Sequence, residues 1–357
     1  MRTTAQPRTA VSYSLAGLAI EVRCDDRSVA ELVDERFGSL PTGPNPTGAE
    51  IGAREGVGCE AYVEGGGGPD ITIEIRGPNA DPLWPGRPAG IPRVIYDAPS
   101  GGIDYVDESD ELHVFYERRV VLRCRPAQGR IDLAIVADGL DAAVLATHPL
   151  LTIGLLETLK RFARFPLHAG GLARNGRGIL LPGSSGAGKS TTTVALVRAG
   201  FDFLADDTVF LTPTPGRESG ILVHGFPDQI DVTGQTAAMF PELAHFVAQP
   251  LPTGRDKHGF RVEDAFGVLP LARCRPTALV FPRITRGRRS FTEPLSAAAA
   301  LRELVPNVLL TDPRASQEHL DMLGRLVGSV PSYVLAAGSD LDLAVDCVSE
   351  LVAEPAA

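Results

Sequence analysis

Lysine is nearly absent from this chain of 357 residues: only Lys160, Lys189 and Lys257 occur among its 34 basic side chains, and the rest are arginines. The 44 acidic residues outnumber the basic ones and give a formal net charge of −10. Nucleic acid is therefore not expected as the main partner, because neutralising its phosphates needs a basic face. An acidic surface still allows a local basic pocket for a nucleotide.

Long apolar runs and paired cysteines are also missing. No stretch approaches the roughly 20 apolar residues of a membrane-spanning helix, so no membrane segment is expected. The apolar run from Tyr13 to Ala19 continues into alternating apolar and charged residues, which favours a first strand over a cleaved signal sequence. The five cysteines form no CxxC pair and have no histidine at a zinc-ligand spacing. Reduced, mostly buried thiols in a cytoplasmic protein are expected.

Length and composition predict a globular protein of two domains. Residues 1–140 are expected to form a β-rich domain with Gly- and Pro-rich loops, and residues 141–357 an α/β domain. One helix, 27–37, follows Asp25-Asp26, which can cap it. The first domain carries no constellation of catalytic residue types. Its expected strands are short runs of alternating polarity: 19–23, 70–76, 111–116, 120–124 and 131–136.

The second half changes character at a helical pattern over about 149–164. Two strands are expected next, joined by a turn at Asn175-Gly176. A glycine-rich loop, a helix and an apolar strand follow, and this order predicts an α/β unit with a nucleotide site at the carboxyl edge of a strand. The two strands are expected at 167–173 and 178–181, the helix at 190–198 and the apolar strand at 201–205. Further strands are expected at 278–281 and 333–336, and further helices at 296–304, 316–326 and 341–351.

The segment Gly183-Ser184-Ser185-Gly186-Ala187-Gly188-Lys189-Ser190 fits the phosphate-loop pattern G-x-x-x-x-G-K-[ST] completely. Its glycines let backbone N–H groups point at phosphate oxygens, and the following helix presents its positive end to the same anion. Lys189 is expected to reach the β- and γ-phosphates, and Ser190 to offer its hydroxyl to Mg²⁺. Thr191 completes the expected nucleotide-binding run. Because lysine is so scarce, a chance match is on the order of a few in a thousand.

Asp206-Asp207 follows the next apolar strand. Carboxylates at the end of a strand beside a phosphate loop are placed to hold Mg²⁺. Two adjacent carboxylates suggest a division of labour, in which one binds the metal and the other accepts a proton from a hydroxyl nucleophile. Which aspartate takes which role stays open. The alternative is a solvated turn, where aspartate is common.

Three segments together resemble the catalytic core of the HPr kinase/phosphorylase family: His168-Ala169-Gly170-Gly171, the loop 183–190, and Leu204-Ala205-Asp206-Asp207. They occur in that family's order and at similar spacing, and the resemblance covers about residues 149–235. It implies an ATP-dependent serine kinase with a fold related to phosphoenolpyruvate carboxykinase, and a homo-oligomer. It also implies a role for His168 near the transferring phosphate or in tuning the aspartate pair.

The chain departs from that family at Val223 and His224, where the family has Glu and Arg before a glycine. This departure argues against the reverse, phosphorolytic reaction and against HPr as the substrate. The chain looks closer to HPr-kinase-like proteins of bacterial gene clusters, some of which phosphorylate a serine of a ribosomal peptide. The cationic stretch 255–261 is interpreted either as a solvated loop or as a segment that brings a cation to the phosphoryl group or an acidic substrate. The arginines at 283, 286, 288 and 289 form a second basic patch, either on the nucleotide or facing water.

The sequence thus predicts ATP- and Mg²⁺-dependent transfer of a phosphoryl group to a hydroxyl, with a serine of a peptide or protein as the expected acceptor. A small-molecule kinase and a non-catalytic nucleotide-binding regulator stay open as alternatives, as does GTP in place of ATP. A transport-type or motor ATPase is disfavoured, because the aspartate pair follows the loop too soon and no LSGGQ-like signature follows Lys189.

Overall fold

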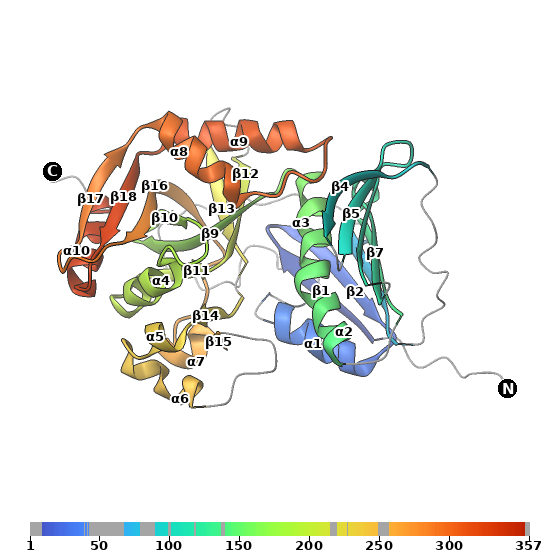
Figure 1. Cartoon of the computed structure of the whole chain (residues 1–357), viewed down its shortest axis with the longest axis horizontal. Helices are drawn as coiled ribbons and strands as arrows, with labels where there is room; N and C mark the ends of the chain where they lie inside the picture. Colours follow the sequence, from blue (N-terminus) through green and yellow to red (C-terminus); the bar gives the residue numbers. More distant parts are fainter. Residues whose placement is uncertain are drawn as a thin grey trace. The chain divides into compact units, whose positions relative to one another are not determined.

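The computed structural model describes residues 9–38, 40, 42, 68–78, 90–98, 101–117, 119–136, 140–214, 220–226, 228–248 and 257–353 (Figure 1). The chain forms two compact units. Unit 1 comprises the chain up to Arg164 together with Leu310–Gln317, and unit 2 comprises Phe165–Leu309 and the chain from Glu318 onward. The chain therefore leaves unit 1 after Arg164, later than the boundary expected at 140/141.

Unit 1 is built on an eight-stranded sheet with the order β1-β2-β3-β8-β7-β6-β5-β4 (Figure 1). The five strands expected from alternating polarity are confirmed to within two residues, whereas β1, β4 and β5 were not expected. The strands are β1 (Thr9–Leu15), β2 (Leu18–Cys24), β3 (Ile71–Arg76), β4 (Arg93–Ala98), β5 (Gly101–Val106), β6 (Glu111–Tyr116), β7 (Val120–Arg125) and β8 (Arg130–Ile135). The expected β-rich first unit and the mixed α/β class of the chain are both observed.

Helices cover one face of this sheet. Helix α1 (Arg27–Phe37) begins where expected, because the carboxylate of Asp26 accepts a hydrogen bond from the Val29 N–H. A longer helical stretch follows β8 and consists of α2 (Leu140–Leu145), the π-helical η2 (Ala146–Leu151) and α3 (Thr152–Lys160). Helix α3 packs so closely on β7 that a Cβ at Gly154 would lie 2.8 Å from Leu122. This packing explains why residues 141–164 belong to unit 1 and not, as expected, to the second domain.

The stretch Ala142–Lys160 is long and apolar enough, by length and composition alone, to cross a membrane, with a mean hydropathy of 1.4. However, 61% of it is buried within the described structure. It also carries Glu157 and Lys160, whose side chains are completely buried. These features are those of a core helix.

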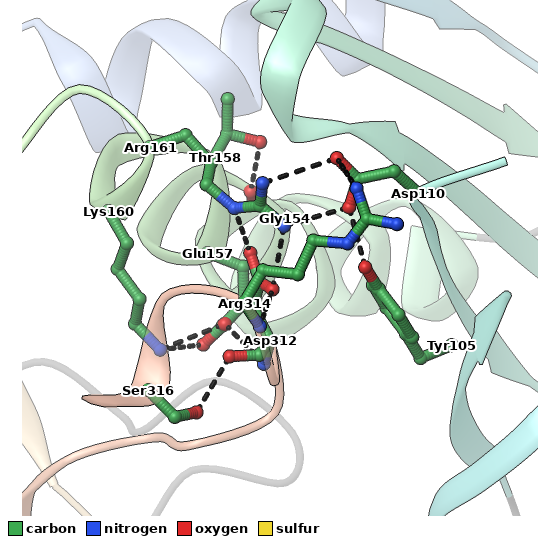
Figure 2. Close-up of polar contacts among 10 residues, drawn as sticks. All are labelled: Tyr105, Asp110, Gly154, Glu157, Thr158, Lys160, Arg161, Asp312, Arg314 and Ser316. Atoms are coloured by element: carbon green, nitrogen blue, oxygen red, sulfur yellow. Dashed lines mark hydrogen bonds and ion pairs between the residues drawn. The ribbon is translucent and has the colours of Figure 1, made fainter. Parts of the chain in front are cut away.

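A network of buried charges at the end of α3 holds the segment Leu310–Gln317 in unit 1 (Figure 2). The ammonium of Lys160 donates hydrogen bonds to both carboxylate oxygens of Glu157, at 2.7 and 2.8 Å. The backbone N–H of Asp312 donates to the same carboxylate at 3.1 Å. The guanidinium of Arg161 pairs with Asp312 through two nitrogens, at 2.6 and 2.8 Å. Burial raises the pKa of Glu157, although the Lys160 charge opposes this.

Unit 2 is organised by a second large sheet with the order β10-β9-β12-β13-β16-β18-β17 (Figure 1). In addition to this order, β11 pairs with β9, and β10 pairs with β16. β9 and β16 are therefore each paired with different strands along two parts of their length. The strands are β9 (Phe165–Arg174), β10 (Arg177–Pro182), β11 (Asp202–Ala205), β12 (Thr208–Pro213), β13 (Ile221–Gly225), β16 (Arg273–Ile284), β17 (Phe291–Leu295) and β18 (Ser332–Ala337), with a separate pair β14 (Ile230–Val232) and β15 (His258–Phe260).

The two faces of the unit 2 sheet are covered by different helices (Figure 1). Helices α4 (Lys189–Arg198) and α10 (Leu341–Leu351) share a core with β10, β16 and β18. On the other face, α9 (Ser316–Ser329) brings His319 to 5.5 Å from the Phe165 ring. The remaining helices are α5 (Gly234–Ala237), η3 (Pro241–Leu243), α6 (Ala244–Val247), α7 (Val262–Phe266), α8 (Ala297–Leu304) and η4 (Val305–Asn307), and η1 (Pro126–Gln128) lies in unit 1.

Replacing Glu157 by Gln should destabilise unit 1, because the buried Lys160 ammonium would lose the Glu157 carboxylate beside it. Removing one partner of a buried ion pair costs about 3–5 kcal/mol. Urea denaturation followed by circular dichroism should show a loss of this size in the free energy of unfolding. Arg27→Ala is the control, because it breaks only an exposed pair with Glu31 and should change the free energy by less than about 1 kcal/mol. Similar losses in the two variants would refute a structural role for the buried pair.

Candidate functional site

The backbone pairing of β9 brings the predicted site residues together. On one edge of β9, Ala169 lies opposite Pro182, the last residue of β10, so the glycine-rich loop begins there. The other edge pairs first with β12 and then with β11, and Asp206-Asp207 fills the break between these two strands. The backbone N–H of Ala169 donates to the carbonyl of Asp207 at 3.0 Å. The start of the loop and the aspartate pair therefore flank the same residue of β9.

The loop 183–188 connects the carboxyl end of β10 to the amino end of α4, as the sequence predicted. Gly186 and Gly188 have φ angles of 80° and 98°, in the left-handed region that glycine adopts without strain. Gly188 is also the residue before the first turn of α4 and supplies no side-chain cap. The first backbone N–H groups of α4 therefore receive no hydrogen bond from a side chain at residue 188. They are oriented to donate to a bound anion instead.

Lys189 lies folded back on the loop. Its side chain is nearly buried, and its ammonium donates to the carbonyls of Gly183 and Ser184 at 2.6 and 3.3 Å. Burial lowers the pKa of Lys189, and the nearby charge of Lys257 lowers it further, while the two aspartates oppose the shift. Two of the three lysines of the chain therefore lie near each other and near the loop.

Asp206 is the buried member of the aspartate pair. The hydroxyl of Ser190 donates to its Oδ2 at 2.8 Å, while Oδ1 is buried without a hydrogen-bond partner among the described residues. Burial raises the pKa of Asp206 to about 6, against the opposing effect of the Ser190 hydrogen bond. A buried carboxylate with one unused oxygen next to a serine hydroxyl fits a hard cation such as Mg²⁺.

Ser190 and Asp206 alone would not form a complete metal cage. No group of three or more His, Cys, Asp or Glu side chains that could hold a metal ion occurs in the described parts of the chain. Mg²⁺ characteristically takes one or two protein carboxylates and completes its shell with waters and substrate phosphates. The residues present therefore fit a metal that arrives with a nucleotide.

Asp207 is the exposed member of the pair and contacts His168. Nδ1 of His168 lies 3.1 Å from Oδ1 of Asp207, and the two side chains are 37% and 54% exposed. The register of the sheet explains the contact, because His168 lies opposite Thr208, the residue that follows Asp207. The structure thus brings His168 to the aspartate pair.

Close packing explains why the His168–Gly171 segment contains small residues. A Cβ at Gly170 would lie 3.0 Å from Oγ1 of Thr193 on α4 and 3.5 Å from the carbonyl oxygen of Asp206. Because Gly170 has no side chain, α4 and the backbone of Asp206 can both pack closely against β9. Thr193, whose own hydroxyl is buried near Asp206 and lowers the pKa of that carboxyl, was not predicted as part of the site.

Further elements border the loop. The hydroxyls of Thr191 and Thr236 lie 2.9 Å apart, which ties α5 to the first turn of α4. Of the cationic stretch 255–261, residues 255 and 256 lie outside the described residues. His258–Phe260 form β15, and Arg261 is the residue before α7. Among the departures from the family pattern, Val223 is buried and His224 lies 3.1 Å from the Thr212 hydroxyl.

The second basic patch splits into two parts. The guanidinium of Arg283 pairs with Glu303 at 2.9 Å on the surface. The three later arginines, at 286, 288 and 289, are exposed in the turn that follows β16.

The raised pKa of Asp206 predicts a stability that depends on pH. Between about pH 4 and pH 6 the folded protein holds a proton that the unfolded chain has lost, so stability falls as the pH rises through this window. At pH 8 and without metal, the ionised carboxylate costs about 3 kcal/mol. Asp206→Asn should therefore raise the melting temperature in EDTA at pH 8 but not at pH 4. Asp207→Asn should raise it much less at pH 8, because this exposed residue only adds a neighbouring charge to the effect of burial. An Asp206→Asn variant less stable than wild type at pH 8 would contradict this account.

No protein-family model matches the chain, and no curated protein matches it. Comparison with solved structures finds, among others, a structure of the Hpr(Ser) kinase/phosphatase from Coxiella burnetii. The match has a TM-score of 0.30 and 14% sequence identity, and it covers 52% of this chain and 88% of that one. Membership of the HPr kinase family stays a prediction from the sequence.

Proposed function

We propose that unit 2 transfers the γ-phosphoryl group of ATP, bound with Mg²⁺, to the hydroxyl of a serine in a peptide or protein. The observation that carries this proposal is the convergence on β9 of three groups. These are the glycine-rich loop 183–188, the Ser190–Asp206 pair and the Asp207–His168 pair. Phosphoryl transfer needs an anion cradle, a metal ligand and a base close together, because its catalysis is mainly positioning and electrostatics.

The loop and Lys189 would bind the phosphates. The loop's backbone N–H groups and the amino end of α4 favour an anion at this position. The Lys189 ammonium now donates to two loop carbonyls, and phosphate oxygens would replace these acceptors. Since burial lowers the pKa of Lys189, a nearby phosphate would in turn favour its charged form.

Ser190 and Asp206 would hold the metal. The hydroxyl and the carboxylate are already 2.8 Å apart, and Oδ1 of Asp206 has no other partner in the described structure. When bound, Mg²⁺ neutralises the charge of the β- and γ-phosphate oxygens. The buried position of Asp206 keeps it from an incoming hydroxyl, which suits a ligand better than a base.

Asp207 would act as the base. It is exposed enough to meet an acceptor, and its contact with His168 orients the carboxylate. In this role the carboxylate accepts the proton of the attacking hydroxyl, and the histidine positions it. In this proposal Asp206 binds the metal and Asp207 accepts the proton, an assignment that the sequence left open.

An open site favours a polypeptide acceptor over a small molecule. Asp207, the base in this proposal, is more than half exposed. Small-molecule sites are enclosed and bury most of their ligand. The resemblance of the sequence to serine kinases supports the same choice of acceptor.

Mg²⁺-ATP should raise the melting temperature of the wild-type protein, and Lys189→Ala should lose most of this shift. Ligand at a hundred times its dissociation constant stabilises a protein by about 2.7 kcal/mol. Arg302→Ala, which removes an exposed cation on α8, is the matched control and should keep the full shift. Differential scanning fluorimetry with and without Mg²⁺-ATP makes the comparison. Equal shifts in Lys189→Ala and wild type would remove the phosphate-loop assignment.

Asp207→Asn should cut phosphoryl transfer by at least about a hundredfold while nucleotide binding survives. Peptides and proteins encoded beside this gene, incubated with enzyme and Mg²⁺-ATP, should gain the mass of one phosphoryl group on a Ser or Thr. Mass spectrometry locates the site, and Arg302→Ala again serves as the control, with undiminished transfer. A wild-type protein that binds ATP but transfers phosphate to no hydroxyl would favour the non-catalytic regulator. Phosphate found only on a free sugar would favour the small-molecule kinase.

A further inference from the structure

Ile284 is an exposed apolar side chain at the carboxyl end of β16, with 68% of its surface accessible. β16 runs parallel to β10, and Leu279 lies opposite Leu180. Both strands therefore end at the same edge of the sheet, where β10 leads into the loop 183–188. Ligands of open α/β sheets bind at this carboxyl edge.

The side chain of Ile284 lies against the last glycine of the loop. A Cβ at Gly188 would be 3.2 Å from Cγ1 of Ile284 and 3.6 Å from its Cδ1. Alternation along β16 places Ile284 on the same face as Ala278 and Val280, which belong to the core shared with α4. Ile284 thus lies beside Gly188, the residue at which the loop passes into α4.

The backbone that carries Ile284 is firmly held. The N–H of Thr285 donates to the carbonyl of Ala337 at 2.8 Å. In the turn that follows, the carbonyls of Gly287 and Arg288 accept hydrogen bonds from the N–H groups of residues 339 and 340, both at 3.1 Å. An exposed apolar side chain on a fixed backbone offers a preorganised surface, so a ligand that packs on it loses little to ordering.

We propose that Ile284 forms the seat of the nucleobase, whose ring packs on the isoleucine side chain while the phosphates occupy the loop. This inference rests on the proposed function, because it assumes that a nucleotide binds at residues 183–191. The chemistry of the contact is the burial of a flat, largely apolar ring face on an aliphatic side chain next to the loop. Neither the phosphate-loop pattern nor the resemblance to kinases assigned a role to this residue.

The test separates the base from the phosphates by comparing two ligands, Mg²⁺-ATP and Mg²⁺-tripolyphosphate. Isothermal titration calorimetry measures both affinities for wild type, Ile284→Ala, Ile284→Leu and Val305→Ala. Val305, the residue that follows α8, is an exposed aliphatic control on another element. Losing most of one buried aliphatic side chain should weaken ATP binding about five- to tenfold.

The expected result is that Ile284→Ala weakens ATP only, with tripolyphosphate unchanged, while Ile284→Leu and Val305→Ala bind both ligands like wild type. Unchanged ATP affinity in Ile284→Ala would overturn the inference and leave the proposed function intact. An equal loss for both ligands would overturn it too, because Ile284 would then only support the loop. Wild type that binds neither ligand would refute the proposed function itself, and this inference with it.

Discussion

The hydrogen bonding of β9 to three other strands is the constraint on which the candidate site depends. β10 lies on one edge of β9, and β12 and β11 follow each other along the opposite edge. The loop, the aspartates and His168 lie in separate segments of the sequence. They meet only through this strand pairing, so no single element contains the candidate site. The close approach of α4 at Gly170 then sets the first turn of the helix, with Ser190, beside Asp206.

The two aspartates differ because their surroundings differ. Asp206 is buried with one unused oxygen, and this burial raises its pKa to about 6, whereas Asp207 is exposed beside His168. A buried, partly unsatisfied carboxylate opposes folding unless a cation or a proton compensates it. We therefore expect the buried Asp206 carboxylate to lower the stability of the ligand-free protein, as is common for functional sites.

Local patterns predicted much of unit 2 and the first helix of unit 1. The capping aspartate and the helical spacing located α1, and the glycines of the loop located the turn between β10 and α4. The strand β5 was not predicted, because buried and half-buried residues do not alternate along it. The unit boundary was misplaced because α3 packs back on β7. Contacts between distant segments, such as Thr191 with Thr236 or Ile284 with Gly188, leave no local signal. The contact of His168 with Asp207 was suggested only by the resemblance to a kinase family.

Hydrogen–deuterium exchange with and without Mg²⁺-ATP tests most directly whether the loop binds phosphate. Backbone N–H groups of residues 183–191 should become protected when nucleotide and metal are both present, because they then donate to phosphate oxygens. Mg²⁺ alone should give no such protection. Exchange in this segment that is unchanged by saturating Mg²⁺-ATP, or protection confined to unit 1, would show that the loop does not bind the phosphates of ATP.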